Sequence, residues 1–297
     1  MAVATRPLAK TAAAGHAEHL TTLDIILKIV AYVVLIAVAL AMFIPFLFSL
    51  ATSLKTTPES YHLTWSNMFI PASPTIDAYR TLRSTDIVRW FGNSAGVAAV
   101  WVIARAVFDA MAGYALSRMQ FFGRNALFLI ILSTMMVPPI VLIIPRFIIL
   151  KDLHILNSYG ALTIPFLTDA FGIFLMKQFF ETIPKELEEA ARVDGASRYR
   201  MFREIILPNA MPALTALAIF SFQGSWNDFL DPLIFISGGN SKLYTLPLGL
   251  AYFHSTYYTD WPVVMAIAVI TTLPMAIVFV IFQRWFVEGT VSAGIKG

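Results

Sequence analysis

The sequence predicts an all-α polytopic membrane protein with six transmembrane helices and both termini in the cytoplasm. Among its 297 residues there are only 21 Lys and Arg and 18 Asp and Glu, whereas 58% are hydrophobic. A soluble domain carries about 25% charged residues, so 13% leaves too few to cover a water-facing surface. Apolar runs of the roughly 20 residues that a spanning helix needs recur along the chain without a period of two, which excludes barrel strands.

Six stretches are long and apolar enough to be spanning helices. Four of them are free of charge, and the other two carry internal charges such as Arg105 and Asp109. In chain order the predicted spans are residues 29–54, 93–117, 125–145, 159–180, 205–227 and 261–283.

The placement of Lys and Arg predicts the orientation of these spans. With the N-terminus in the cytoplasm, 13 of the 21 basic residues fall in cytoplasmic segments and seven fall outside. Cytoplasmic loops carry the basic excess, so the chain is expected in the cell's inner (cytoplasmic) membrane as a multi-pass protein. The predicted parts are a mobile cytoplasmic tail at 1–24, a first transmembrane helix at 25–54, an external segment at 55–91, a core at 92–287 and a cytoplasmic tail at 288–297.

The sequence contains no recognisable catalytic or metal site. It has no Cys, and its five His residues show no ligand spacing. It lacks a G-x-S-x-G elbow and a G-x-x-x-x-G-K-[ST] phosphate loop. We therefore expect no enzyme activity, no catalytic residue, no metal and no cofactor on this chain. A net charge of +3 is too small to indicate a nucleic-acid partner.

One predicted cytoplasmic segment, residues 182–208, is hydrophilic and rich in both signs of charge. Pro184 suits the first turn of a helix, and Gly195 fits a left-handed helix stop. Ser197 can cap a second helix. The segment thus predicts two short helices around a glycine, and the docking face of the first helix is expected to consist of Leu187, Ala190 and Ala191.

The spacing within 182–208 resembles the EAA loop of the permease subunits of binding-protein-dependent ABC importers. A solvated basic loop would have the same composition, but it would not need residues at these separations: Glu189-Ala190-Ala191, three residues, Gly195, nine residues, Ile205, one residue, Leu207-Pro208. The resemblance assigns contact with an ATPase to Glu189, Ala190, Ala191, Arg192, Asp194, Gly195, Ile205, Leu207 and Pro208.

The chain from about residue 90 onward resembles the maltose-transporter type of carbohydrate permease, in the partner that lacks a large periplasmic insertion. Segments that carry this resemblance are Asn93-Ser94, residues 112–119, 135–139, 226–229 and 283–287, and the tail residues Gly294, Lys296 and Gly297.

The resemblance implies a type I ABC importer permease fold and a set of partners. These are a second homologous permease, two ATPase subunits that hold ATP and Mg, an extracellular or periplasmic solute-binding protein, and membrane lipid. It also implies that Glu189 contacts a basic group of the ATPase and that the tail reaches between the ATPase subunits. The expected function is passage of a sugar, polyol or glycoside by alternating access. The alternative is a secondary transporter or channel subunit, which leaves the spacing within 182–208 unexplained.

Charged and proline residues within the spans are candidates for the substrate pathway. Arg105 and Asp109, four residues apart, either neutralise each other or act in gating, because ionisable groups inside a membrane are costly. Pro138 and Pro139 predict a kink in the third span, which is either architectural or part of the pathway wall.

Trp226, Asn227 and Asp228 form a second candidate group. A flat ring beside polar groups suits a sugar, although Trp at a membrane interface is also a common anchor. Asp231 stands where the resemblance leads us to expect an aromatic residue, so the substrate preference of the family does not carry over directly.

Overall fold

The computed structural model describes residues 22–236, 240–253 and 259–294, with side chains described to residue 283 in the last helix. The described residues form helices and connecting turns, with no strand among them. The chain divides into two units, residues 1–47 and 48–297.

The first unit is described by one helix, α1 (Thr22–Ser53), up to residue 47. Large apolar side chains on all sides of this helix are exposed. At 1.5 Å per residue its 32 residues exceed the roughly 30 Å of hydrocarbon in a bilayer. A helix that is apolar all round is typical of a membrane span, and α1 coincides with the first predicted span.

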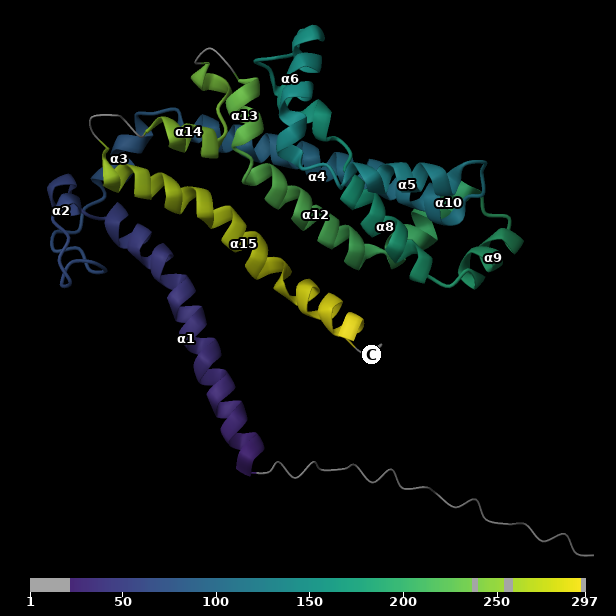
Figure 1. The fold of residues 1–297 in the computed structure, drawn as a ribbon, viewed down its shortest axis with the longest axis horizontal. Coiled ribbons are helices and arrows are strands. Elements are labelled where there is room, and N and C mark those ends of the chain that lie inside the picture. The colour runs from purple at the N-terminus through teal and green to yellow at the C-terminus, as the bar shows by residue number, and fades with distance from the viewer. Residues whose placement is uncertain (1–21, 237–239, 254–258, 295–297) are drawn as a thin grey trace, which may run out of the picture. The chain divides into compact units, whose positions relative to one another are not determined.

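The second unit is built on three helices that lie side by side: α4 (Ile87–Arg118), α8 (Ala170–Thr182) and α12 (Met211–Trp226) (Figure 1). A fourth, α15 (Trp261–Gly294), runs along α12. Small buried residues such as Ala98 and Ala110 on α4 allow close helix packing, which is how helices associate in a membrane.

Gly113 allows α4 to approach α8. A Cβ at this position would lie 2.8 Å from Cβ of Met176 and 2.9 Å from the backbone N of Lys177, both on α8. Gly113→Ala should therefore lower the stability of the purified protein by about 1–3 kcal/mol. Gly96→Ala on the same helix has open space around it and should be neutral or slightly stabilising. Equal thermal unfolding midpoints for the two variants would contradict this packing.

Six regions of the chain are long and apolar enough to cross a membrane if each of two bent helix pairs counts as one span. Four stretches pass on their own, at 22–53, 87–118, 159–182 and 261–283. The two bent pairs are 124–134 with 139–152, which turn by 95°, and 198–209 with 211–226, which turn by 79°. All six predicted spans are therefore found as helical regions, but the third and fifth are not single straight helices.

The third span breaks where the sequence predicts a kink. It consists of α5 (Arg124–Thr134), the 3-10 turn η1 (Pro139–Leu142) and α6 (Ile143–Asp152). Pro138 adopts an extended conformation, with φ −57° and ψ 132°, because a following proline disfavours the helical region. The predicted kink is confirmed, and the helical region extends to residue 152, beyond the predicted end at residue 145.

The fourth predicted span is also interrupted. It consists of α7 (Tyr159–Thr163), the 3-10 turn η2 (Ile164–Phe166) and α8. The Asp169 side chain caps α8 by accepting a hydrogen bond from the Gly172 N–H at 3.3 Å. A polar cap at membrane depth satisfies backbone groups that the break would otherwise leave without partners.

The fifth span was predicted to start at residue 205, which is before the membrane helix begins in the structure. Its first residues belong to α10 (Arg198–Met201), the π-helix η3 (Phe202–Ile206) and α11 (Leu207–Asn209), which continue the 182–208 segment. The chain turns near Ala210, and the membrane helix α12 starts at Met211. Pro212 lies in the first turn of α12, where its missing N–H leaves no broken bond.

Short helices occupy the segments between the spans. The segment 55–91 holds α2 (Thr57–Tyr61) and α3 (Asp77–Arg83), and α4 begins at Ile87. After α12 come α13 (Leu230–Phe235), the turn η4 (Ser241–Leu243) and α14 (Leu246–Tyr252). The short helix α14 packs on α4.

Candidate functional site

The segment 182–208 forms two short helices around Gly195, as predicted. The first is α9 (Glu186–Val193), and the second is α10. Gly195 has φ +77°, the left-handed region that favours glycine. The Ser197 side chain accepts a hydrogen bond from the Arg200 N–H at 3.3 Å and caps α10. Pro184 differs from the prediction, because it lies two residues before α9 and outside its first turn.

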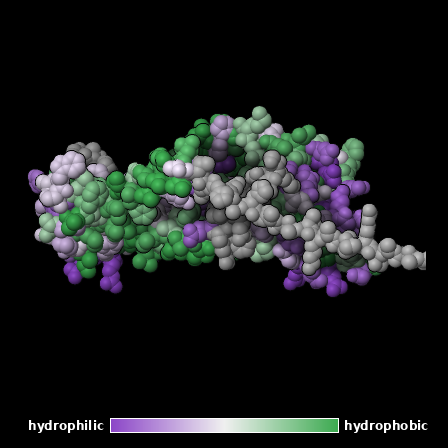
Figure 2. All heavy atoms as spheres, turned by 90° about the horizontal axis from the view of Figure 1, so that it is seen from below, coloured by the Kyte–Doolittle hydropathy of each residue, from purple (hydrophilic) through white to green (hydrophobic). Residues whose placement is uncertain are grey.

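Hydrophilic side chains gather at the end of the second unit that carries α9 and α10, as the purple residues on the right of Figure 2 show. On α9 itself, Glu188 and Ala191 are buried, whereas Leu187, Glu189 and Ala190 are exposed. The predicted face of Leu187, Ala190 and Ala191 is thus divided, because Ala191 packs inward with Glu188. The outward surface of α9 retains Leu187, Glu189 and Ala190.

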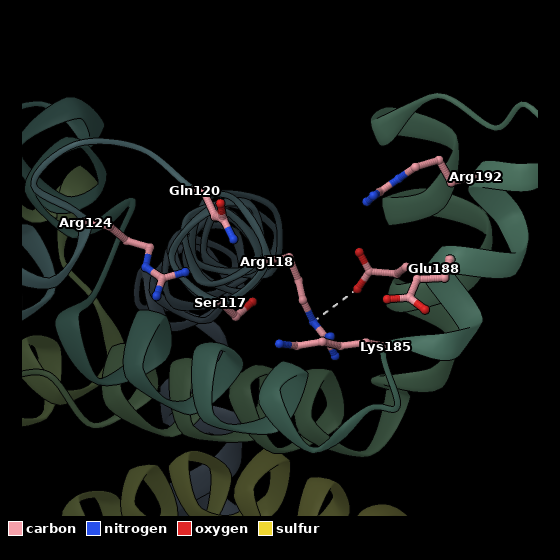
Figure 3. A pocket seen from close by; sticks show the side chains of 8 residues that line it. Ser117, Arg118, Gln120, Arg124, Lys185, Glu188 and Arg192 are labelled. Atoms are coloured by element: carbon pink, nitrogen blue, oxygen red, sulfur yellow. Dashed lines mark ion pairs between the residues drawn. The ribbon is translucent and has the colours of Figure 1, made fainter.

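A buried ion pair holds α9 to the end of α4. Nε of Arg118, the last residue of α4, lies 3.1 Å from Oε1 of Glu188 (Figure 3). The two side chains are only 4% and 10% exposed. Their atoms are not aligned as a hydrogen bond, so the attraction is mainly one between opposite charges. The same guanidinium donates through Nη2 to the carbonyl oxygens of Phe180 and Ile183.

Arg118 therefore joins three elements: α4, the end of α8 and α9. The Phe180 carbonyl accepts the Ile183 N–H at 3.2 Å at the end of α8, and the Arg118 guanidinium supplies a second donor to it. Sequence reasoning missed both Arg118 and Glu188 as site residues. The available signal was the spacing of three between Glu188 and Ala191, which places them on one face of a helix.

The other residues assigned to coupling lie along the rest of the segment. Arg192, Asp194 and Gly195 are exposed at the end of α9. Ile205 and Leu207 are half-buried and Pro208 is exposed, on the stretch that turns into α12. Ile206, which the sequence pattern does not specify, is fully buried and fixes this stretch to the helices beneath it.

A pocket of about 270 Å³ separates α9 from the end of α4 (Figure 3). Basic residues from several elements surround it, together with two carboxylates. Its lining consists of Ser117, Arg118, Gln120, Arg124, Lys185, Glu188, Glu189 and Arg192.

Within the described residues, Arg105 and Asp109 form hydrogen bonds with other groups and no direct ion pair with each other. Nε of Arg105 donates to the Phe166 carbonyl at 3.0 Å. Oδ1 of the fully buried Asp109 accepts from the Thr168 hydroxyl at 2.6 Å and from the Asp169 N–H at 3.1 Å. Both side chains satisfy polar groups at the break between η2 and α8, because that break exposes donors and acceptors that the membrane cannot hydrate.

Trp226 lies in the core, where it is 1% exposed. Its indole Nε1 donates to the Thr271 carbonyl on α15 at 2.9 Å, and its ring stacks on Phe222. Asn227 is exposed at the end of α12. The three predicted neighbours therefore have different surroundings, and the flat ring is turned toward the protein interior.

Asp228 and Asp231 form a polar cluster with Arg146 of α6. Oδ1 of Asp228 accepts from the Asp231 N–H at 3.3 Å, and Nη1 of Arg146 lies 3.5 Å from Oδ1 of Asp231. Burial raises the pKa of the Asp228 carboxyl to about 7. Burial likewise raises the pKa of Asp231, although the charge of Arg146 opposes it. Asp231, which stands where an aromatic residue was expected, is therefore paired with the cation of Arg146.

The remaining predicted residues are the two prolines of the third span and the residues of the C-terminal tail. Pro138 and Pro139 are exposed at the bend of the third span. The helix α15 continues into the predicted tail as far as Gly294. Lys296 and Gly297 lie outside the described residues.

Comparison with known proteins matches residues 110–291 to the family model described as "Binding-protein-dependent transport system inner membrane component". The arabinooligosaccharides transport system permease protein AraQ of Halalkalibacterium halodurans is 38% identical over 208 residues, which is 70% of this chain and 74% of that protein. The sn-glycerol-3-phosphate transport system permease protein UgpE of Yersinia pestis is 36% identical over 203 residues, 68% of this chain and 72% of that protein.

A solved structure shares the fold over most of the chain. It is the crystal structure of a bacterial ABC transporter involved in the import of the acidic polysaccharide alginate, with a TM-score of 0.80 and 25% identity. The match covers 90% of this chain and 98% of that one. The residues that match the family model include the α9 segment and all or part of five of the six span regions. The chain therefore belongs to the inner membrane components of binding-protein-dependent transport systems and is a permease subunit of an ABC importer.

Proposed function

We propose that this chain forms half of the translocation pathway for a sugar or sugar derivative, and that α9 couples it to an ATPase subunit. The observation that carries the coupling is the division of α9 into two faces. Glu188 and Ala191 hold the helix to the protein, while Leu187, Glu189 and Ala190 remain exposed for a partner.

The coupling depends on a rigid connection between α9 and α4. In this proposal ATP and Mg are held by two ATPase subunits, and closure of their nucleotide sites moves α9. The Arg118 guanidinium transmits that displacement to α4, because it contacts Glu188 on one side and lies at the end of a 32-residue helix on the other. At 1.5 Å per residue, α4 is about 48 Å long, so a movement at its end reaches the far side of a membrane.

The second half of the pathway requires a second, homologous permease. In this proposal alternating access arises from movement of the two permeases against each other, with solute delivered by a solute-binding protein outside. Large apolar side chains remain exposed on several helices of this chain. Lipid and the second permease are the partners proposed to cover them.

The carbohydrate assignment rests on the relatives and on one polar cluster. The similar proteins are named for arabinooligosaccharides and sn-glycerol-3-phosphate, and the similar structure for alginate, all of them polyhydroxylated or derived from such compounds. Arg146, Asp228 and Asp231 offer the charged hydrogen-bonding groups that a hydroxylated solute requires. We place these residues in the pathway with Asn227, Pro138 and Pro139, and we assign Trp226, Arg105 and Asp109 to the fold.

The test is ATPase stimulation of the reconstituted importer with its own binding protein. The panel contains arabino-oligosaccharides, alginate oligosaccharides, sn-glycerol-3-phosphate and, as a negative control, an amino acid. One of the first three should stimulate ATP hydrolysis several-fold above the basal rate. Stimulation by the amino acid alone would contradict the carbohydrate assignment. Uptake by the chain without any ATPase would instead support the secondary transporter.

A further inference from the structure

The pocket beside α9 contains more positive than negative charge among the described residues that line it. Arg118 and Glu188 pair with each other. The other charged residues that line the pocket are one acid, Glu189, and three bases, which are Arg124, Lys185 and Arg192. Within the described part of the chain, none of these three cations forms an ion pair with an acidic residue.

The cations converge from different parts of the fold. Arg124 begins α5, Lys185 precedes α9 and Arg192 lies in the last turn of α9. Figure 3 shows Arg124 on one side of the end of α4, and Lys185 and Arg192 on the other side. Arg124 is held in place by the hydrogen bond from Nη1 to the Met119 carbonyl at 3.2 Å. A ligand with oxygen atoms on several sides would satisfy such an arrangement better than a single carboxylate.

An exposed apolar surface begins next to this pocket. The helix α5, which Arg124 starts, has no buried residue. Leu127, Leu129 and Ile130 on α5 are exposed, and Phe122 just before it is fully exposed. The pocket therefore lies where a polar, positively charged recess meets a surface suited to hydrocarbon.

We propose that this pocket binds the phosphate headgroup of an anionic phospholipid from the cytoplasmic leaflet, with the acyl chains along α5. Basic pockets beside transmembrane helices on the cytoplasmic side are typical sites for such headgroups. At about 270 Å³ the pocket holds a headgroup but not a whole lipid, so the chains lie outside, against Leu127 and Ile130, which follow Arg124 at helical spacings of three and six. The site links α5 to α9 and shares Glu189 and Arg192 with the residues assigned to the ATPase contact, so the test below measures lipid binding and ATPase retention separately.

The experiment measures lipid retention by the purified importer complex with native mass spectrometry. The probes are dihexanoyl phosphatidylglycerol, dihexanoyl phosphatidylcholine and inorganic phosphate. Phosphatidylglycerol should bind at least about tenfold more tightly than phosphatidylcholine. Each basic residue near an anionic lipid contributes about fivefold in affinity, so Arg124→Gln combined with Lys185→Gln should weaken phosphatidylglycerol binding roughly 20- to 30-fold.

Two further variants separate charge from folding. Arg124→Lys with Lys185→Arg keeps both charges and should retain phosphatidylglycerol. Arg83→Gln with Lys151→Gln removes the same two residue types from exposed positions on α3 and α6 and should leave binding unchanged.

Three results would overturn the proposal. The first is equal retention of the two lipids. The second is displacement of phosphatidylglycerol by inorganic phosphate at equal concentration, which would make the pocket a simple anion site. The third is loss of the ATPase from the Gln variant with unchanged lipid binding, which would assign the pocket to the ATPase contact.

Discussion

Arg118→Met is expected to abolish solute uptake and to destabilise the permease. The change leaves the Glu188 carboxylate buried without its cation and removes the donor from the Phe180 and Ile183 carbonyls. Removing one partner of a buried ion pair costs about 3–5 kcal/mol. Because α9 would no longer be fixed to α4, ATP hydrolysis in the reconstituted importer should continue without a matching rate of transport.

Two controls test whether burial is the cause. Arg200→Met breaks the ion pair between Arg200 and Glu204 in the same segment, but those side chains are 64% and 56% exposed. Exposed pairs contribute less than about 1 kcal/mol, so this variant should melt close to the wild type. Arg118→Met combined with Glu188→Leu removes both buried charges and should recover most of the lost stability. Equal melting temperatures for Arg118→Met and Arg200→Met would contradict the claim that the buried ion pair of Arg118 and Glu188 fixes α9 to α4.

Glu189→Lys should release the ATPase while leaving the permease folded. Glu189 is exposed on α9 and forms no ion pair with a basic residue within the described residues. Exposed substitutions usually change stability by no more than about 0.5 kcal/mol. Reversing a charge that faces a basic group of a partner costs several kcal/mol. We expect at least a tenfold loss of ATPase co-purification and a corresponding loss of uptake.

The matched control for this charge reversal is Asp152→Lys. Asp152 is an exposed carboxylate at the end of α6, far along the chain from α9. It undergoes the same change of two charge units and should retain the ATPase and normal uptake. Wild-type ATPase retention by Glu189→Lys would remove Glu189 from the interface.

The parts of the site that follow local rules could be predicted from the sequence. The left-handed Gly195 and the Ser197 cap depend on neighbours within three residues, and the structure places both as expected. The inward face of α9 could not be predicted in the same way. Arg118 is 70 residues from Glu188, and only the packing of α4 beside α9 brings the two charges together.

The spans show the same division between local and tertiary causes. Pro138 and Pro139 predict a kink, but neither its size of 95° nor the contact between α6 and α13 beyond it follows from the local sequence. Arg105 and Asp109 have the spacing of a helical ion pair, yet each finds a partner at the break before α8. Two residues signal that break in the sequence: Pro165, which lies in η2, and Asp169, whose capping role requires knowledge of where α8 begins.

Site-directed crosslinking at α9 tests the central claim most directly. The chain contains no Cys, so Ala190→Cys provides the sole thiol of this subunit, at an exposed position on α9. Ser66→Cys places the thiol at an exposed position in the segment 55–91 as the control. With a short thiol-to-amine crosslinker and the assembled importer, we predict a product joining this chain to the ATPase from position 190 and none from position 66. Absence of that product at 190, or equal yield at both positions, would contradict the account.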